Sequence, residues 1–538
     1  MRNSKRIWRF VLVIMSVTLA VSFLSCSDGG RKARSGGTII IGETSDYESL
    51  NPMQTTDAHA RDIYNQLFLL LMDENPDLLT FSPRLAKSYD FSEDRKKLTF
   101  HLRKDASWSD GVKITSRDVL ATFSVQKDTT VVWASIHLKD HIDSVTAPDD
   151  YTVVYHFNHI YPYQVMDAVD GPILPAHFLE KHPGVSIKSV PIEDFPTSGP
   201  FRVEAWVKGQ SLTLVPNERY YDSDKPFLDK VIFKIVPDQV TINTQLKSGE
   251  IDGMEIYSPG EVEALRTEYP ELTVHQYQGR GYVYIGWNGA RAPFDNMNVR
   301  RALSYAIDRQ KIIDNLYYGL AKECVGPFPP IIWAHDPDIE PIPCDPERAK
   351  EILAAEGYSD SDGDGYLDKD GKIFEFELLA NLGNQIRADI QVMVQEALRE
   401  IGVKVTPVTM EWTVMLSRHK ASDFDAVISA WRASTKADLY PIWGCEARAE
   451  GGYNRVDYCN PIVDSLNTVA TSILDFDEAR PIFNRAERII YEEQPYTFLY
   501  VPSGILVLNS RIRGARPDAI SSIHNIHEWY IEGDSQGH

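Results

Sequence analysis

The chain has 538 residues, 43% of them hydrophobic, so it is long enough for several domains with substantial apolar cores. Its 77 acidic residues outnumber its 55 basic residues and give a net charge of −22 at pH 7. A surface of this sign repels phosphate groups, so we expect no nucleic acid and no anionic membrane surface as a partner. The charge is typical of an acidic, water-exposed surface.

Residues 1–25 have the pattern of a signal peptide. Basic residues precede an apolar run over 10–24, which is shorter than an ordinary transmembrane span. The run ends in Phe23-Leu24-Ser25-Cys26, which resembles a bacterial lipobox, and we expect Cys26 to become the lipidated first residue of the mature protein. A secretory peptide without lipidation is the alternative. Residues 26–36 show no apolar periodicity, and we expect them to form a tether.

The first elements after the tether predict a mixed α/β fold. Residues 38–42 are a β-branched apolar run typical of a buried strand, and an amphipathic helix is expected near 57–70. Residues 97–103 alternate as in a strand, and Asp110-Gly111 predicts a hairpin turn. Thr115 or Ser116 is placed to cap the helix that follows. We expect Trp108 and Trp133 to lie in the core.

Two helices are expected in the middle of the chain. The apolar face of the first has helical spacing, with Asp295 as its N-cap candidate: Val299, Ala302, Leu303, Ala306 and Ile307. Asp308 then caps a second helix, which Gly319 ends in the left-handed conformation. This second helix is expected to bury Ile312, Ile313 and Leu316.

Residues 293–312, PFDNMNVRRALSYAIDRQKI, resemble the stretch that opens the second lobe of family 5 extracytoplasmic solute-binding proteins. These proteins are the oligopeptide, dipeptide and nickel binders of ABC importers. Other blocks are similar in the same order and extend the resemblance over most of residues 37–510: SLNP at 49–52, LAKSY at 85–89, WSDGVKITSRDV at 108–119 and LKSGEID at 246–252.

The resemblance implies an α/β fold of the periplasmic-binding-protein type II class, with two lobes joined by a hinge and three domains. The first lobe is discontinuous: its main domain is expected over 37–81, 188–287 and 503–538, and its small domain over 82–187. The second lobe is expected over 288–502. Residues 281–287 would carry the chain across and 496–501 would bring it back, so that closure of the lobes traps a ligand.

Residues 360–368, DSDGDGYLD, invite a calcium interpretation. Asp360, Asp362, Asp364 and Asp368 stand at positions 1, 3, 5 and 9 of a loop with glycine at position 6, as at the start of an EF-hand loop. Position 12 is Gly371 instead of the bidentate glutamate. Such loops are common in family 5 as plain turns. We therefore expect a turn and no metal, with the calcium loop as the alternative.

Four cysteines remain besides Cys26, an even number in an exported chain. Sequence order pairs Cys324 with Cys344 and Cys445 with Cys459. Neither pair has the spacing of a zinc site. We therefore expect two local disulfides.

The resemblance also implies where a ligand binds. Residues 55–58 occupy the place where family members present backbone from the first lobe, which makes Thr56 and Asp57 candidates. Residues 410–440 resemble the stretch that lines the cleft of peptide-binding members, with Trp412 and Trp431 as apolar, orientation-tolerant walls. A core position is the alternative for each tryptophan.

Two positions depart from the peptide-binding pattern. Ser434 stands where those members usually carry an aspartate for the α-ammonium of the ligand, and Ile428 where some carry a basic residue near its carboxylate. A charged terminus buried without a counter-charge costs several kcal/mol, which disfavours free-ended peptides in the usual register. Asp438, near Tyr440, offers a negative charge from a shifted loop, and Lys436 instead favours an anionic group.

No catalytic motif such as HExxH, GxSxG or a Walker loop occurs, so we expect neither enzymatic activity nor a cofactor. We predict a ligand-binding lipoprotein of an ABC importer that captures a small peptide or related solute and delivers it to a permease with its ATPase. It is expected to be monomeric and lipid-anchored to a bacterial membrane, facing the periplasm or the cell exterior. A surface lipoprotein of the same fold, acting as a sensory or adhesive module without transport, is the alternative.

Overall fold

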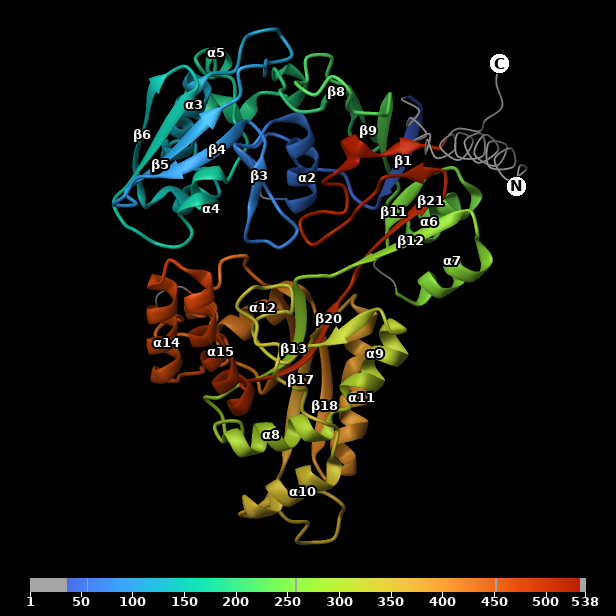
Figure 1. Ribbon diagram of the computed structural model, residues 1–538. Helices are drawn as coiled ribbons and strands as arrows, with labels where there is room; N and C mark the ends of the chain where they lie inside the picture. The colour runs from blue at the N-terminus through green and yellow to red at the C-terminus, as the bar shows by residue number, and fades with distance from the viewer. Residues whose placement is uncertain (1–35, 56, 257–258, 450–451, 533–538) are drawn as a thin grey trace, which may run out of the picture.

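The computed structural model describes residues 36–55, 57–256, 259–449 and 452–532. Figure 1 shows two lobes, one above the other, connected by two chain segments. The lipobox, Cys26 and Thr56 lie outside the described residues. No described helix is both long enough and apolar enough to cross a membrane.

A seven-stranded sheet forms the centre of the first lobe. Its strand order is β12 (Leu272–Tyr277), β21 (Gly504–Asn509), β11 (Gly253–Glu255), β1 (Thr38–Glu43), β10 (Lys230–Ile235), β9 (Ser211–Pro216) and β8 (Phe201–Val207). Strand β1 pairs in parallel with β10 and β11, and its Ile39 and Ile41 are buried, which confirms the first predicted strand. Its helices are α2 (Ala58–Leu67), α6 (Gln239–Ser248) and α7 (Val262–Glu268).

A four-stranded sheet at the upper left of Figure 1 belongs to the same lobe. Its order is β4 (Ala86–Phe91), β5 (Lys97–Leu102), β7 (Thr152–Phe157) and β6 (Ile142–Asp149), accompanied by α3 (Ser116–Lys127), α4 (Gln164–Val169) and α5 (Ala176–Leu179). Thr115 and Asp118 form a reciprocal capping box at the start of α3. Asp118 also accepts a hydrogen bond from the buried Trp108 indole at 3.1 Å, so this tryptophan is a core residue as predicted. Between the two sheets lies a hairpin of β2 (Met72–Glu74) and β3 (Phe81–Pro83).

The second lobe is built on a six-stranded sheet. Its order is β14 (Ala321–Glu323), β20 (Tyr496–Pro502), β13 (Gly281–Trp287), β19 (Ala426–Arg432), β17 (Glu375–Asn381) and β18 (Lys404–Met410). The helices of this lobe are α8 (Met297–Ala306), α9 (Arg309–Tyr317), α10 (Pro346–Ala355), α11 (Gln385–Glu400), α12 (Trp412–Lys420), α13 (Tyr440–Trp443), α14 (Pro461–Ser472) and α15 (Phe476–Glu493). The remaining short pairs are β15 (Asp368–Lys369) with β16 (Lys372–Ile373) and, in the first lobe, β22 (Ile512–Arg513) with β23 (Tyr530–Ile531).

Helices α8 and α9 are the two predicted in the middle of the chain, and the first begins one residue later than expected. Asn296, not Asp295, is the N-cap of α8 and accepts a hydrogen bond from the Asn298 N–H at 2.9 Å. Asp295 lies within the preceding turn, where its N–H donates to the Arg291 carbonyl. Asp308 caps α9 as predicted, accepting from the Lys311 N–H at 2.8 Å.

Two chain crossings connect the lobes, through residues 278–280 before β13 and through Ser503 between β20 and β21. Both have a glycine in close contact. A Cβ on Gly279 would lie 2.2 Å from the Pro502 carbonyl oxygen, and a Cβ on Gly504 would lie 2.1 Å from the ring of Tyr277. Only glycine leaves room for the Pro502 carbonyl at the first point and for the Tyr277 ring at the second.

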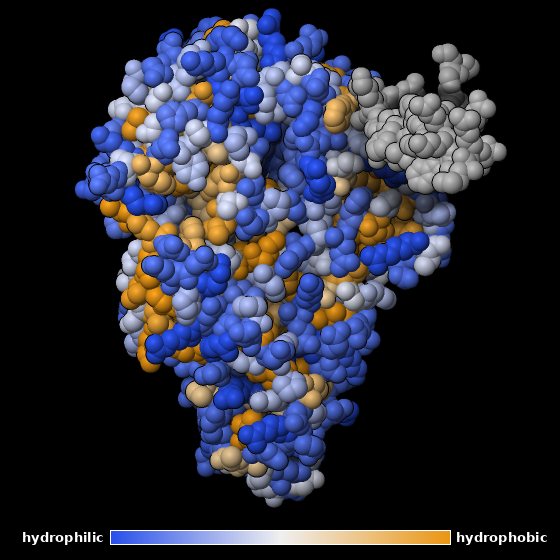
Figure 2. All heavy atoms as spheres, viewed as in Figure 1, coloured by the Kyte–Doolittle hydropathy of each residue, from blue (hydrophilic) through white to orange (hydrophobic). Residues whose placement is uncertain are grey.

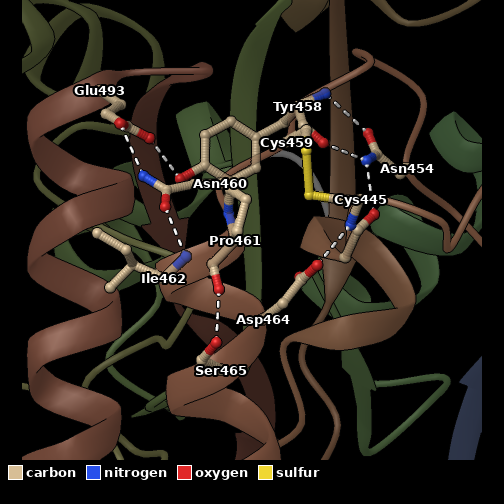
Figure 3. Close-up of a disulfide and its surroundings, with 11 residues drawn as sticks. Cys445, Asn454, Tyr458, Cys459, Asn460, Pro461, Ile462, Asp464, Ser465 and Glu493 are labelled. Atoms are coloured by element: carbon tan, nitrogen blue, oxygen red, sulfur yellow. Dashed lines mark hydrogen bonds between the residues drawn. A yellow bond between two sulfur atoms is a disulfide. The ribbon is translucent and has the colours of Figure 1, made fainter.

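One of the two predicted disulfides is present. Cys445 and Cys459 are bonded, with a Cα–Cα distance of 4.4 Å, and close the loop that precedes α14 (Figure 3). Asn454 holds the inside of this loop by donating to the Gly444 and Tyr458 carbonyls at 3.0 and 2.6 Å.

The prediction that Cys324 pairs with Cys344 is wrong. Cys324 is buried, and its thiol donates to the Gly326 carbonyl at 3.3 Å. Cys344 is exposed and lies 4.0 Å from the Ala306 carbonyl oxygen. The folded chain places the two thiols in different surroundings, and burial raises the pKa of Cys324 to about 12.

The acidic loop at 360–368 brings the carboxylates of Asp360, Asp362 and Asp364 within 4.8 Å of one another. Each of these carboxylates accepts hydrogen bonds from backbone N–H groups of the loop itself. Asp368 accepts from the backbone and hydroxyl of Ser361 instead, at 2.9 and 2.6 Å. The expected turn is therefore present, and calcium binding stays an untested alternative.

Hydrophilic residues cover most of the face shown in Figure 2, and hydrophobic residues show mainly along the band where the lobes meet and on the left flank of the second lobe. This distribution agrees with the acidic, water-exposed surface expected from the composition.

Substitution Gly279→Ala is expected to lower the free energy of unfolding by about 1–3 kcal/mol, because the added Cβ overlaps the Pro502 carbonyl and forces the two crossings apart. Chemical denaturation of the purified protein measures the change. Gly281→Ala is the matched control, since its Cβ would lie 3.4 Å from the nearest atom, the Trp431 carbonyl oxygen. Equal stability of the two variants would contradict the close contact at the crossings.

Candidate functional site

A cavity of about 1250 Å³ lies between the lobes. The first lobe contributes residues of α2, the β2–β3 hairpin, the small domain and the segment 516–528, and the second lobe contributes mainly the end of β19 and the segment after it. Arg280 of the first crossing completes this part of the lining. Charged and aromatic side chains dominate the lining, which includes Arg61, Asp62, Tyr64, Glu74, Tyr161, Tyr163, Asp167, Asp170, Arg280, Arg432, Ser434, Lys436, Asp438, Arg516, Ser521 and Glu528.

Most charges in the cavity wall have a partner. The Arg84 guanidinium lies 3.2 Å from the Asp73 carboxylate, and Arg516 pairs with Glu528. The Arg61 guanidinium lies 3.7 Å from the Asp170 carboxylate, which is a loose ion pair. These pairs lie within the first lobe, so they shape the cavity without holding the lobes together.

Three contacts join the lobes at one end of the cavity, and we call them the interlobe contact. Lys436, on the loop after β19, forms an ion pair with Asp167 of α4. The Tyr163 hydroxyl donates to the Ala437 carbonyl at 2.9 Å, and the Tyr163 ring lies 5.9 Å from the ring of Phe476 at the start of α15. Lys436 is therefore occupied by a protein carboxylate and is not a free cation for a ligand.

Two of the predicted ligand-binding residues, Ser434 and Asp438, line the cavity. The Ser434 hydroxyl accepts from the Lys436 N–H at 3.1 Å. One oxygen of Asp438 accepts from the Tyr440 N–H at 3.0 Å and from the Asn467 amide at 2.9 Å. Asp438 thus shapes its own loop as well as facing the cavity.

Three predicted residues lie outside the described cavity lining. Asp57 caps α2, accepting from the His59 N–H at 2.9 Å. Trp412 is the first residue of α12 and is 44% exposed. Tyr440 begins α13 and lies in sequence between the lining residues Asp438 and Pro441. Ligand contact by these side chains stays a prediction.

Trp431 is also outside the cavity lining, behind its wall. Its indole N–H donates to the Tyr496 hydroxyl at 3.2 Å, and its ring centroid lies 5.6 Å from that of Tyr453 in the disulfide loop. Ile428, three residues earlier, is fully buried in the core of the second lobe. The strand β19 therefore anchors this segment in the core before it reaches the cavity.

The arginines of the cavity were not predicted from the sequence. Arg280 lies in the first crossing and Arg432 ends β19, and Gly281 pairs with Arg432 across the two strands. No motif marks either residue. The only available signal was the position of Arg432, directly after Trp431 in the segment expected to line the cleft.

Two acidic side chains beside the cavity have strongly raised pKa values. Burial raises the pKa of Asp62 to about 7; its hydrogen bond with Ser521 opposes this, and Glu255 adds to it. Burial, followed by the negative charge of Glu255, raises the pKa of Glu43 to about 8. Near neutral pH both carboxyls are therefore partly protonated.

Comparisons with known proteins agree with this architecture. Residues 80–450 match the family described as Bacterial extracellular solute-binding proteins, family 5 Middle. The chain is 30% identical over 543 residues to oligopeptide-binding protein AppA of Bacillus subtilis, covering 97% of this chain and 98% of that protein. The structure of AppA in complex with a nonapeptide aligns with a TM-score of 0.73 over 93% of this chain and 100% of that one.

Two further relatives have other ligands in their names. Heme-binding protein A of Haemophilus influenzae is 26% identical over 485 residues, which cover 85% of each chain. The structure of NikZ from Campylobacter jejuni in complex with Ni(L-His) is 25% identical, with a TM-score of 0.74 over 92% of this chain and 99% of that one.

Two α/β lobes joined by two crossings, with a ligand-sized cavity between them, define a periplasmic-binding-protein fold of type II. The predicted fold class is thereby confirmed. The chain belongs to the bacterial extracellular solute-binding proteins of family 5, as its sequence blocks indicated, and this is a family of binding proteins.

Stability is expected to fall as the pH rises through the raised pKa of Asp62. The unfolded carboxyl titrates near about 3.9, so between that pH and about 7 the folded state holds the extra proton and is stabilised by acid. Asp62→Asn removes this dependence, so the variant should melt a few degrees above the parent at pH 8, with a smaller difference at pH 5. Thermal melts at the two pH values measure it.

Asp224→Asn, at an exposed carboxyl outside the described cavity lining, is the control and should change the melting temperature equally at both pH values. A constant difference between Asp62→Asn and the parent across this range would contradict the raised pKa.

Proposed function

We propose that this protein captures a small peptide or related solute between its lobes and delivers it to the permease of an ABC importer. The observation that carries the proposal is the cavity of about 1250 Å³ lined by both lobes, because only closure of the lobes completes its walls. This volume exceeds the roughly 300–1,000 Å³ of a typical small-molecule site and accommodates an extended ligand. Relatives named for oligopeptide and dipeptide binding support the same class.

The ligand has to suit a cavity without the usual charged partners for peptide ends. Ser434 supplies a hydroxyl where an aspartate would neutralise an α-ammonium, and Ile428 is buried away from the cavity. Asp438 is the carboxylate of this segment nearest in sequence to Ser434, and it faces the cavity. We infer that the bound solute is either a peptide in a shifted register, with its ammonium near Asp438, or a related molecule without that group.

The interlobe contact supports closure as the capture step. Lys436 and Asp167 belong to different lobes, and the Asp167 side chain is only 4% exposed. Opening the lobes would leave the Asp167 carboxylate without this cation, so the contact favours the closed state. Ligand affinity in such a protein includes the free energy of closure.

Delivery to a permease places the protein outside the cytoplasmic membrane. We propose that lipidation of Cys26 anchors it there and that residues 26–36 tether the lobes to the lipid. The signal-peptide pattern and the family's extracellular description support this location.

Purified mature protein is expected to carry a small molecule that native mass spectrometry detects and that is lost after mild unfolding and refolding. Short peptides added to the refolded protein should then bind saturably, as measured by intrinsic tryptophan fluorescence. Lys436→Met should weaken that binding about tenfold, because it removes the cation that pairs with Asp167 when the lobes meet.

Lys350→Met is the control, since Lys350 forms an exposed ion pair with Glu347 on α10 at the far end of the second lobe. Absence of any retained molecule, together with no binding across peptide, amino-acid, sugar and metal-chelate panels, would overturn the proposed function.

Cys26→Ala is expected to move the protein from the membrane fraction to the soluble exported fraction, because a lipid on Cys26 is the proposed anchor. Immunoblots of fractionated cells measure the distribution. Ser27→Ala, the adjacent residue, should leave it unchanged. Membrane retention of the Cys26→Ala protein would refute the lipid anchor.

A further inference from the structure

Two arginines in the cavity wall make no hydrogen bond or ion pair through their side chains within the described part of the chain. They are Arg280 and Arg432, whereas the other arginines and the lysine of the wall are paired. The Arg280 Nε is buried without an acceptor. A buried donor without an acceptor is costly, so these groups indicate an acceptor other than the described residues.

The two arginines also repel each other. Burial lowers the pKa of Arg280 to about 10, and the positive charge of Arg432 is the next cause, ahead of the opposing charge of Glu74. The strand pairing of β13 with β19 explains the proximity, since Gly281 is opposite Arg432 and the Ala433 N–H donates to the Arg280 carbonyl at 2.9 Å. The sheet of the second lobe therefore holds two like charges together at the edge of the cavity.

A third arginine approaches from the other lobe. Arg61 of α2 makes the loose 3.7 Å contact with Asp170 and interacts with the Tyr64 side chain, and its charge also lowers the pKa of Arg280. Besides Asp170, the acids near this group include Asp62 and Glu74, and burial raises the pKa of both of these carboxyls. They neutralise the arginines only in part, so closing the lobes concentrates positive charge unless an anion enters.

We propose that Arg280 and Arg432, with Arg61 facing them from the first lobe, form an anion subsite that binds a carboxylate of the captured ligand. A carboxylate accepts paired N–H donors from guanidinium groups in a planar geometry, which makes arginine suited to this role. The inference rests on the proposed function and names a feature of its ligand. The carboxylate comes either from the C-terminus of a peptide or from an acidic side chain.

This subsite also links binding to closure. Arg280 lies in the crossing segment itself, next to the Gly279 contact with Pro502, and Arg61 lies on the opposite lobe. An anion between them replaces repulsion across the cleft with attraction to both lobes. The bound carboxylate therefore favours the closed state.

The test compares four probes with the refolded protein, read by calorimetry: Ala-Glu-Ala, Ala-Gln-Ala, C-terminally amidated Ala-Gln-Ala, and glutarate. Ala-Glu-Ala carries both kinds of carboxylate and is expected to bind at least tenfold more tightly than the amidated peptide, which has none. In the Arg280→Gln/Arg432→Gln variant the binding of Ala-Glu-Ala should weaken about ten- to hundredfold, while that of the amidated peptide is unaffected. If amidation of Ala-Gln-Ala weakens its binding, the bound carboxylate is the C-terminus of the peptide. If Ala-Glu-Ala binds more tightly than Ala-Gln-Ala, the bound carboxylate is the acidic side chain.

Arg348→Gln, which removes an exposed arginine on α10, is the matched control. The double variant should melt at or above the temperature of the parent, because it removes a repulsive pair; a lower melting temperature would indicate a structural role and count against the subsite.

The remaining outcomes separate the two proposals. Equal binding of all three peptides, or equal affinities in the parent and the double variant, overturns the anion subsite and leaves peptide capture intact. If no peptide binds, peptide capture is overturned, and glutarate then tests the subsite alone. Saturable binding of glutarate that is lost in the double variant supports the anion subsite. Absence of glutarate binding overturns the subsite as well.

Discussion

The contact between the two chain crossings is the constraint on which the rest of the structure depends. Gly279 packs so closely on the Pro502 carbonyl, and Gly504 on the ring of Tyr277, that neither position has room for a side chain. Strands β12 and β13 on one crossing, and β20 and β21 on the other, continue directly into the sheets of the two lobes. Because each crossing is a few residues long and anchored at both ends in a sheet, it limits how the two lobes can move relative to each other.

The same constraint makes the first lobe dependent on the end of the chain. Strand β21 lies between β12 and β11, so the seven-stranded sheet is complete only when residues 504–509 return from the second lobe. Pairings of this sequence separation close late and slowly in folding. The first lobe is therefore not a continuous unit in sequence, whereas every strand of the second-lobe sheet lies within residues 281–502, and each lobe has its own core.

The electrostatic preference of the cavity depends on which of its charged side chains are paired with each other. Ion pairs within the first lobe remove most of the charge of the wall, and the Lys436–Asp167 pair is used to join the lobes. What remains is a pair of arginines at the edge of the second-lobe sheet, opposite acids whose burial favours their protonated form. The proposed anion subsite would thus favour anionic groups in the cleft of a protein whose overall charge is −22.

Local pattern was enough to predict many of the elements. The predicted crossing strand 281–287 coincides with β13, and Asp308 caps α9, because strand runs and caps depend on neighbouring residues. Asn296 and not Asp295 caps α8, because Asp295 belongs to the preceding turn, in which its N–H donates to the Arg291 carbonyl. Sequence order paired Cys445 with Cys459 correctly and Cys324 with Cys344 wrongly, since nearness along the chain does not ensure nearness of two thiols in the fold.

By itself, the sequence determined the family, the α/β class and the segment after β19 that reaches the cleft, because these follow from motif order and apolar periodicity. The tertiary structure decided which side chains face the cavity. It turned Trp431 toward Tyr496 and paired Lys436 with Asp167. It also placed Arg280 beside Arg432, with no hydrogen bond or ion pair from either side chain to another described residue. The reason is physical: pairing of charges and exposure to a cavity depend on residues hundreds of positions apart, brought together only when both crossings are formed.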